Sequence, residues 1–270
     1  MDTMTKEHSI RPYPEAPIRW EGSKPGDSAE HSPRQNYLLA ALPLAIYERL
    51  LPDLEPVPLP LGRTVHGAGE RDKYAYFLTA GIVSRFYTIE NGASTDYAVT
   101  GSEGAIGVGC FLGGEGSSSQ AVVVSTGHAY RLRADLLKRE FEHGGPLPLL
   151  LMRYTLALIA QAGQIAVCTR HHSLEQQLCR WLLSCLDRLP SNDLIMTQEL
   201  ISQMLGVRRE GITGAAGHLQ KLGILRYARG HIGVLDLPLL NAHACECNGV
   251  IRQEYARLLP AGKSIGNAGV

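Results

Sequence analysis

The residues best suited to recognition chemistry are Arg208, Arg209 and Glu210, at the start of a predicted helix. An arginine there can donate two parallel hydrogen bonds to guanine O6 and N7, and a glutamate can accept one from cytosine N4. These are the bonds by which a helix reads base edges in the major groove of DNA. The other candidate contacts to bases or phosphates are Thr197, Gln198, Thr213, His218 and Arg229.

Two short helices joined by a tight turn would position these side chains. Thr197 is a good N-cap for the first helix, and Gly206 falls in the turn, where a positive φ favours glycine. Two steeply crossed helices must touch at apolar or small positions. Those positions hold Ile201, Ser202, Leu205, Val207, Ile212 and Ala215. The alternative interpretation is an ordinary helical pair with surface charges.

A basic wing is predicted after the second helix. The run ILRYARGHIGVLDL contains two short strands around Arg229-Gly230, where an arginine can contact phosphate. The pattern therefore predicts a winged helix-turn-helix over residues 171–240.

Composition limits the remaining possibilities. The chain has 270 residues, 44% of them hydrophobic, and 26 basic against 26 acidic residues. This allows two domains but gives no global basic field, so any nucleic-acid surface must be local. The N-terminus does not resemble a signal peptide, and we expect no segment to reach the roughly 18 to 20 apolar residues of a membrane span. We therefore expect a cytoplasmic protein with no membrane partner, and six scattered cysteines fit a reducing compartment.

Between the N-terminus and the predicted wing, the sequence pattern changes from helical to strand-like and back to helical. Residues 37–54 favour a short helix, whereas 61–133 hold β-branched and aromatic runs between glycines, with a hairpin signal at Asn91-Gly92. A helix is then predicted from about 147 to 167, with an apolar stripe that is either core or a dimer seam. The stripe contains Leu149, Met152, Leu156, Ile159 and, less regularly, Ile165. Ser173 and Gln176 form a capping box that opens the next helix.

These elements predict an α+β fold: an N-terminal antiparallel β-roll of the jelly-roll kind, a long dimerisation helix and a C-terminal winged helix-turn-helix. The expected divisions are a flexible arm (1–35), the roll as sensor domain (36–146), the dimerisation helix and hinge (147–170), the DNA-binding domain (171–240), and a C-terminal helix and tail (241–270).

The arrangement resembles the Crp/Fnr family of transcription regulators over about residues 37–240. The supporting segments are GRTVHGAGE, YAYFLTAGIVSRF with Gly81, and above all TQELISQMLGVRREGITGAAGHLQKLGIL. The resemblance implies a homodimer on an inverted repeat of double-stranded DNA, with RNA polymerase as a possible partner. Arg209 and Glu210 match base-reading residues of the cyclic-AMP-responsive members, but a further base-reading arginine of the family falls on Gly214. The binding mode is therefore carried over, and the operator sequence is not.

The effector segment departs from the family pattern. Cyclic-nucleotide-binding members supply a glutamate to the ribose and an arginine to the phosphate, but Gly107 and Ser119 stand at those places. A buried phosphate needs a bidentate cation. We therefore predict an effector other than a cyclic nucleotide. The candidate pocket residues are Gly107, Val108, Gly109, Cys110, Ser119 and Gln120.

The cysteines give no recognisable metal motif. Oxygen-sensing members of the family use cysteines in an N-terminal run, and residues 1–109 contain none. Cys245 and Cys247 need further ligands, with His243 the only near candidate, so we interpret them as a surface thiol pair. No metal site and no cofactor is predicted. Cys110 is the first candidate for redox sensitivity, whereas Cys179 and Cys185 are interpreted as core residues.

The histidines, like the cysteines, are interpreted as residues without a ligand role. Histidine-ligated haem is a sensing mode of the family, but His66 and His128 are more simply read as hydrogen-bonded strand residues. His171 and His172 lie in the predicted hinge, where we interpret them as solvated, with a pH-sensitive hinge as the alternative.

Three functional hypotheses follow. The first is a sequence-specific transcription regulator of the Crp/Fnr type. The second is a small-molecule, redox or metal sensor whose helix-turn-helix makes protein contacts. The third, an enzyme, is disfavoured because the sequence has no nucleophile elbow, phosphate-binding loop or paired metal-ligand motif.

Overall fold

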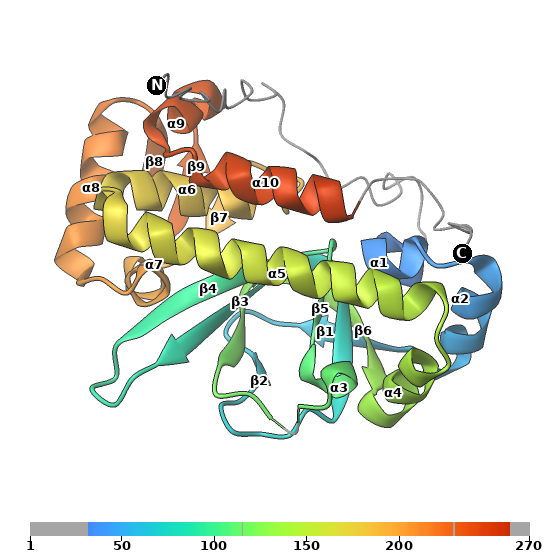
Figure 1. The fold of residues 1–270 in the computed structure, drawn as a ribbon. Helices are drawn as coiled ribbons and strands as arrows, with labels where there is room; N and C mark the ends of the chain where they lie inside the picture. The colour runs from blue at the N-terminus through green and yellow to red at the C-terminus, as the bar shows by residue number, and fades with distance from the viewer. Residues whose placement is uncertain (1–31, 115, 229, 260–270) are drawn as a thin grey trace, which may run out of the picture.

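The computed structural model describes residues 32–259 apart from 115 and 229, and it has the α+β architecture predicted from the sequence. An antiparallel β-roll lies under one long helix, and a second helical unit with a small sheet lies at the far end of that helix (Figure 1).

The N-terminal helices close one end of the roll. They are η1 (Pro33–Gln35), α1 (Tyr37–Ala40), α2 (Leu44–Leu50) and η2 (Leu51–Asp53). The single helix expected over this segment is wrong, because Pro43 divides it into α1 and α2. Asn36 is fully buried and its side-chain amide donates to the carbonyls of Leu78 and Gly104, both at 2.8 Å. Residues 1–31 of the predicted arm lie outside the described residues.

The roll is built from six antiparallel strands in the order β1-β6-β3-β4, with β2 on β6 and β5 on β3. Their bounds are β1 (Glu55–Leu59), β2 (Thr64–His66), β3 (Tyr74–Thr88), β4 (Ser94–Thr100), β5 (Ala105–Ile106) and β6 (Gln120–Arg133). Two short helices, α3 (Gly109–Leu112) and α4 (Ala134–Glu142), flank β6 in the chain. The long strands β3 and β6 pair through several register shifts, which bend the sheet.

Helix α5 (Pro146–His171) crosses the whole molecule, and α10 (Cys247–Leu258) packs along it (Figure 1). One side of α5 is buried against the roll and α10. The other side keeps an exposed apolar row, here named the α5 row, of Leu149, Met152, Leu156, Ile159 and Val167. Ile165, the predicted member of this stripe that fits the spacing least well, is instead buried on the opposite side of α5.

Helix α5 also corrects the expectation about membrane spans. It is 26 residues long and apolar enough to match a spanning helix by length and composition alone. Core helices of soluble proteins have the same length and composition, and one side of α5 is buried inside this protein.

The C-terminal unit begins at α6 (Leu174–Leu186), which opens with the predicted capping box of Ser173 and Gln176. It continues through β7 (Asp193–Ile195), α7 (Gln198–Leu205), α8 (Arg209–Lys221), β8 (Leu225–Ala228), β9 (His231–Val234) and α9 (Leu237–His243). Strand β7 was not predicted from the sequence; it pairs with β9.

This unit is docked on the roll. Ile82, Val99 and Val124 of the roll belong to the same apolar cluster as the side chains of α6, α7 and α8. Trp181 Nε1 donates to Asp96 Oδ2 at 2.9 Å, and Ser94 Oγ donates to the Gln203 carbonyl at 3.1 Å. Polar contacts, these two among them, therefore accompany the apolar interface.

Candidate nucleic-acid interface and ligand cavity

Helices α7 and α8 form the predicted bihelical unit. Thr197 caps α7 by accepting from Leu200 N at 3.1 Å, and Gly206 ends it in the left-handed region at φ 68°. A Cβ at Gly206 would also overlap the Thr95 side chain, so both conformation and space require glycine. The predicted contact residues are buried or half-buried between the helices: Ile201, Ser202, Leu205, Val207, Ile212 and Ala215.

The predicted base-reading residues lie exposed at the N-terminal end of α8. Arg208 is the N-cap residue, Arg209 and Glu210 occupy the first turn, and Thr213 follows on the same exposed helix. Thr213 Oγ1 donates to Gln198 Oε1 at 2.8 Å, so the start of α7 is held against α8. An arginine pair beside the positive end of a helix favours a polyanion.

Two predicted contacts lie elsewhere. His218 stands near the other end of α8, where its Nδ1 is 2.5 Å from Glu175 Oε2 of α6. Arg229, which falls between β8 and β9 in the sequence, lies outside the described residues. The first turn of α8 is therefore the part of the interface that the structure describes most fully.

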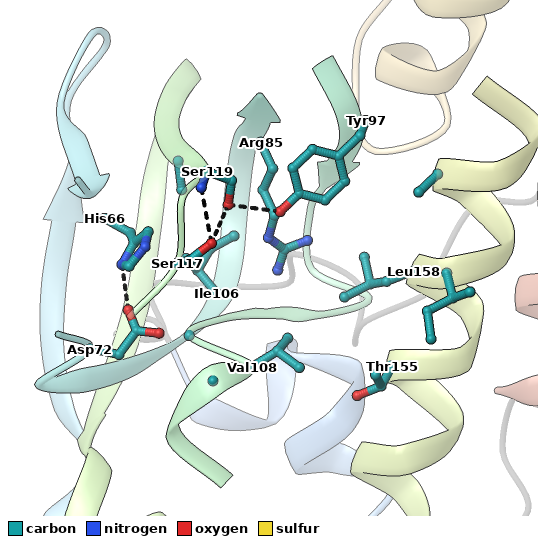
Figure 2. A pocket seen from close by; sticks show the side chains of 15 residues that line it. His66, Asp72, Arg85, Tyr97, Ile106, Val108, Ser117, Ser119, Thr155 and Leu158 are labelled. Atoms are coloured by element: carbon teal, nitrogen blue, oxygen red, sulfur yellow. Dashed lines mark hydrogen bonds and ion pairs between the residues drawn. The ribbon is translucent and has the colours of Figure 1, made fainter. Parts of the chain in front are cut away.

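A cavity of about 220 Å³ lies between the roll and α5 (Figure 2). Strand and loop residues supply its polar side, and α5 supplies Thr155, Leu158, Ile159 and Ala162. Ile159 also belongs to the α5 row, so one helix faces both the cavity and the exposed apolar surface.

The polar wall of the cavity is held by the protein itself. His66 Nδ1 is 2.5 Å from Asp72 Oδ1, and Tyr97, Ser117 and Ser119 form a hydroxyl chain (Figure 2). Burial raises the pKa of the Asp72 carboxyl. His66 Nε2 is buried and has no hydrogen-bond partner within the described part of the chain.

Arg85 brings a buried guanidinium to the cavity (Figure 2). It donates to Thr100 Oγ1 at 2.8 Å and to the Ala105 carbonyl, which also accepts from the Tyr154 hydroxyl at 2.9 Å. The sequence analysis missed Arg85. The sequence offered one sign of it: Arg85 lies in a mainly apolar run that is predicted to be a strand. A buried charge is costly unless it is paired, so an arginine there indicates a specific role.

The residues predicted for the effector pocket are divided by the structure. Gly107, Val108, Gly109 and Ser119 line the cavity, whereas Cys110 and Gln120 are not among its lining residues. Gly107 adopts φ 93°, and a Cβ there would lie 2.8 Å from the Tyr74 carbonyl oxygen. A glutamate at this position would therefore be strained. Cys110 is buried, and burial raises the pKa of its thiol to about 12. Since thiolate is the reactive form, Cys110 is poorly suited to redox sensing.

The interpretation of Cys245 and Cys247 as surface thiols is wrong, because both are buried. His243, the ligand candidate from the sequence, instead contacts Glu175, with 3.4 Å between His243 Nδ1 and Glu175 Oε1. The partners of the pair are instead Cys168 and His172, from the end of α5. His172 is therefore less solvated than expected of a hinge residue, whereas His171 is exposed. The missed signal was the spacing of four between Cys168 and His172, which puts both on one face of a helix.

Comparison with known proteins identifies the C-terminal unit. Residues 176–243 match the family of Crp-like helix-turn-helix domains. No sequence among curated proteins matches the chain significantly.

Solved structures resemble most of the chain. A protein ascribed to the Crp/Fnr family from Eubacterium rectale has a TM-score of 0.62 at 17% identity, with 77% of this chain and 98% of that chain covered. FixK2 from Bradyrhizobium japonicum has a TM-score of 0.62 at 16% identity, covering 71% and 98%. TTHA1359, a Crp/Fnr-family transcriptional regulator from Thermus thermophilus, has 0.57 at 21%, covering 70% and 98%. The chain thus shares its fold with structures ascribed to Crp/Fnr-family regulators, and residues 176–243 carry a Crp-like helix-turn-helix domain.

Proposed function

From its Crp-like helix-turn-helix domain and its Crp/Fnr regulator fold, we propose that this chain is a sequence-specific DNA-binding transcription regulator. The observation that carries the proposal is the exposure of Arg208, Arg209 and Glu210 at the N-terminal end of α8. This end of a recognition helix enters the major groove, where arginine reads guanine and glutamate reads cytosine. The place of action is then the cytoplasm, and RNA polymerase is a further partner.

The α5 row supports a homodimer. Its first four members are spaced by three, four and three residues, which is the spacing of a coiled-coil seam, and Gly163 stands at the next seam position, four residues on. Ile159 is 63% exposed, and a Cβ at Gly163 would meet nothing within 4 Å, so a second α5 can approach closely. A twofold dimer would present two α8 helices to an inverted repeat whose half-sites are about 34 Å apart.

The cavity supports an effector that is small and polar. Its volume of about 220 Å³ lies below the roughly 300 to 1,000 Å³ of common ligand sites. His66 Nε2 offers an unused polar atom, while Gly107 offers no carboxylate for a ribose. Because α5 lines the cavity, a ligand there can alter the packing of the dimer helix. Calorimetry of the full chain with cyclic AMP and cyclic GMP should show no heat, and tight binding with a large change in DNA affinity would contradict this part of the proposal.

Selection of bound sites from random DNA by the purified full chain tests the main proposal. We expect an inverted repeat and an affinity that falls steeply with salt, by about 0.9 log unit per log unit of salt for each phosphate neutralised. Arg209→Ala should weaken binding to the best site by about 1 to 3 kcal/mol and relax selectivity at one base pair. Arg133→Ala, an exposed arginine of the roll, is the matched control and should leave binding unchanged. Absent or salt-insensitive DNA binding by the folded protein would exclude the function.

A further inference from the structure

Four side chains with metal-binding donor atoms converge at the hinge between α5 and α6. Cys168 and His172 lie one helical turn apart at the end of α5, Cys245 lies between α9 and α10, and Cys247 is the first residue of α10. Their donor atoms all lie within 4.8 Å of one another. Cys168 Sγ is 3.5 Å from Cys245 Sγ, and Cys247 Sγ is 3.4 Å from His172 Nδ1. The group is named the hinge cluster below.

We propose that the hinge cluster binds a single zinc ion through Cys168, His172, Cys245 and Cys247. Three thiolates and one imidazole are a common donor set of structural zinc sites. With Zn–S bonds of about 2.3 Å in a tetrahedron, the sulfur atoms stand roughly 3.8 Å apart, close to the separations in the cluster. An iron–sulfur cluster distributes its four protein ligands over two or more iron atoms, so the ligand set as a whole needs wider spacing than the cluster has.

The surroundings of the donors match those of a metal site. Gln164 Nε2 donates to Cys247 Sγ at 3.2 Å. His172 Nε2, the ring nitrogen facing away from the sulfur, lies 3.4 Å from Glu246 Oε2. A carboxylate on the second nitrogen fixes the orientation and tautomer of a metal-bound histidine. The ligands are thus oriented by neighbouring groups, as zinc ligands are.

Burial points the same way. The three cysteines are buried and His172 is mostly covered, which fits a closed site with four protein ligands.

Other interpretations explain less of the geometry. A disulfide between Cys168 and Cys245 would use two groups and leave the approach of Cys247 to His172 without a role. Ordinary buried cysteines in this protein look different: Cys179 and Cys185 pack among aliphatic side chains of α6 and its neighbours. The hinge cluster instead forms a small group of its own, made of three cysteines.

The ion would tie two segments far apart in sequence. It would join the end of α5 to the start of α10 and so fix the hinge from which α6 and the helix-turn-helix extend. This inference stands without the proposed function, because the site is defined by its ligands and by the stability that it adds.

The test is the metal content of the full chain purified without a metal-binding tag. We expect about one zinc per chain by mass spectrometry. Cobalt added after chelation should produce a thiolate charge-transfer band and the intense visible bands of a tetrahedral site. Tight chelators should lower Tm, since an ion that binds only the folded state stabilises it.

Variants make the test specific. His172→Gln, at the least buried ligand, should lose zinc, and Glu246→Gln should weaken zinc affinity by about 10- to 100-fold in competition with a chromogenic chelator. Cys168→Ser should also lose zinc. Cys110→Ser, a buried cysteine of the roll, is the control and should keep it.

Three results would overturn the proposal. These are wild-type protein that neither contains nor takes up zinc or cobalt, full zinc retention in His172→Gln, and a Cys168–Cys245 disulfide in protein purified under reducing conditions. Because cobalt uptake is measured on wild-type protein, a variant that fails to fold does not leave the question open.

Discussion

Helices α5 and α8, which carry the proposed dimer seam and the proposed DNA interface, are held in different ways. Helix α5 is buried on one side against the roll and α10, and its other side carries the exposed α5 row. Helix α8 is anchored by a few buried residues, Ile212, Ala216 and Leu219, and contains three glycines. Changes in α5 should therefore act on the whole fold and its assembly, whereas changes on the exposed side of α8 should act mainly on what it binds and little on stability.

The largest effect is expected on the buried side of α5. Leu151 is fully buried there, so Leu151→Ala should lower the free energy of unfolding by about 2 to 5 kcal/mol. Leu44, at 60% exposure in α2, offers the same deletion at the surface, and Leu44→Ala should cost less than about 0.5 kcal/mol. Equal costs in urea unfolding would show that α5 is not packed as described.

The stability of the contact between the roll and the C-terminal unit, which carries α8, should depend on pH, because Asp96 of β4 accepts a hydrogen bond from Trp181 of α6. Burial raises the pKa of Asp96 from 3.8 to about 6, with Arg180 and the Trp181 hydrogen bond opposing the shift. A carboxyl with a raised folded-state pKa stabilises the fold below its unfolded pKa and loses this stabilisation as pH rises through about 6. The unfolding free energy of wild type minus that of Asp96→Asn should thus fall by roughly 2.4 kcal/mol between pH 4 and pH 7. A flat or rising difference would contradict the buried carboxyl.

The α5 row should control assembly. Leu156→Lys places like charges across a twofold seam and should raise the dimer dissociation constant by about 100-fold, or roughly 2.7 kcal/mol, with the helical content unchanged. Leu44→Lys, an exposed leucine away from the row, is the control. Analytical ultracentrifugation measures both, and an unchanged dimer in Leu156→Lys would move the interface elsewhere.

The sequence predicted the helix-turn-helix well because its determinants are local. The Thr197 cap, the Gly206 turn and the apolar spacing all act within a few residues, so no tertiary information is needed. The cavity was predicted only in part. Whether Arg85 faces it depends on the register of β3 against β6, which shifts several times. No period-two pattern survives such shifts.

The hinge cluster was the hardest feature to predict. Cys168 and Cys245 are 77 residues apart, and they meet only because α10 folds back along α5. The sequence suggested both halves, a cysteine pair and a histidine hinge, but it could not join them. The packing of the two helices, and not the spacing of residues, forms the site.

The smallest expected effect lies on the exposed side of α8. Gly214 is helical, and a Cβ built on it meets nothing within 4 Å. Gly214→Ala should therefore raise the free energy of unfolding by about 0.5 to 1 kcal/mol, because alanine loses less entropy in a helix. Gly211→Ala, on the same helix, should gain less, since its Cβ would lie 2.8 Å from Leu174 Cδ2. If Gly214→Ala stabilises the fold and leaves DNA affinity unchanged, this position does not approach DNA closely; a gain in stability with a loss of affinity would show that the glycine serves the interface.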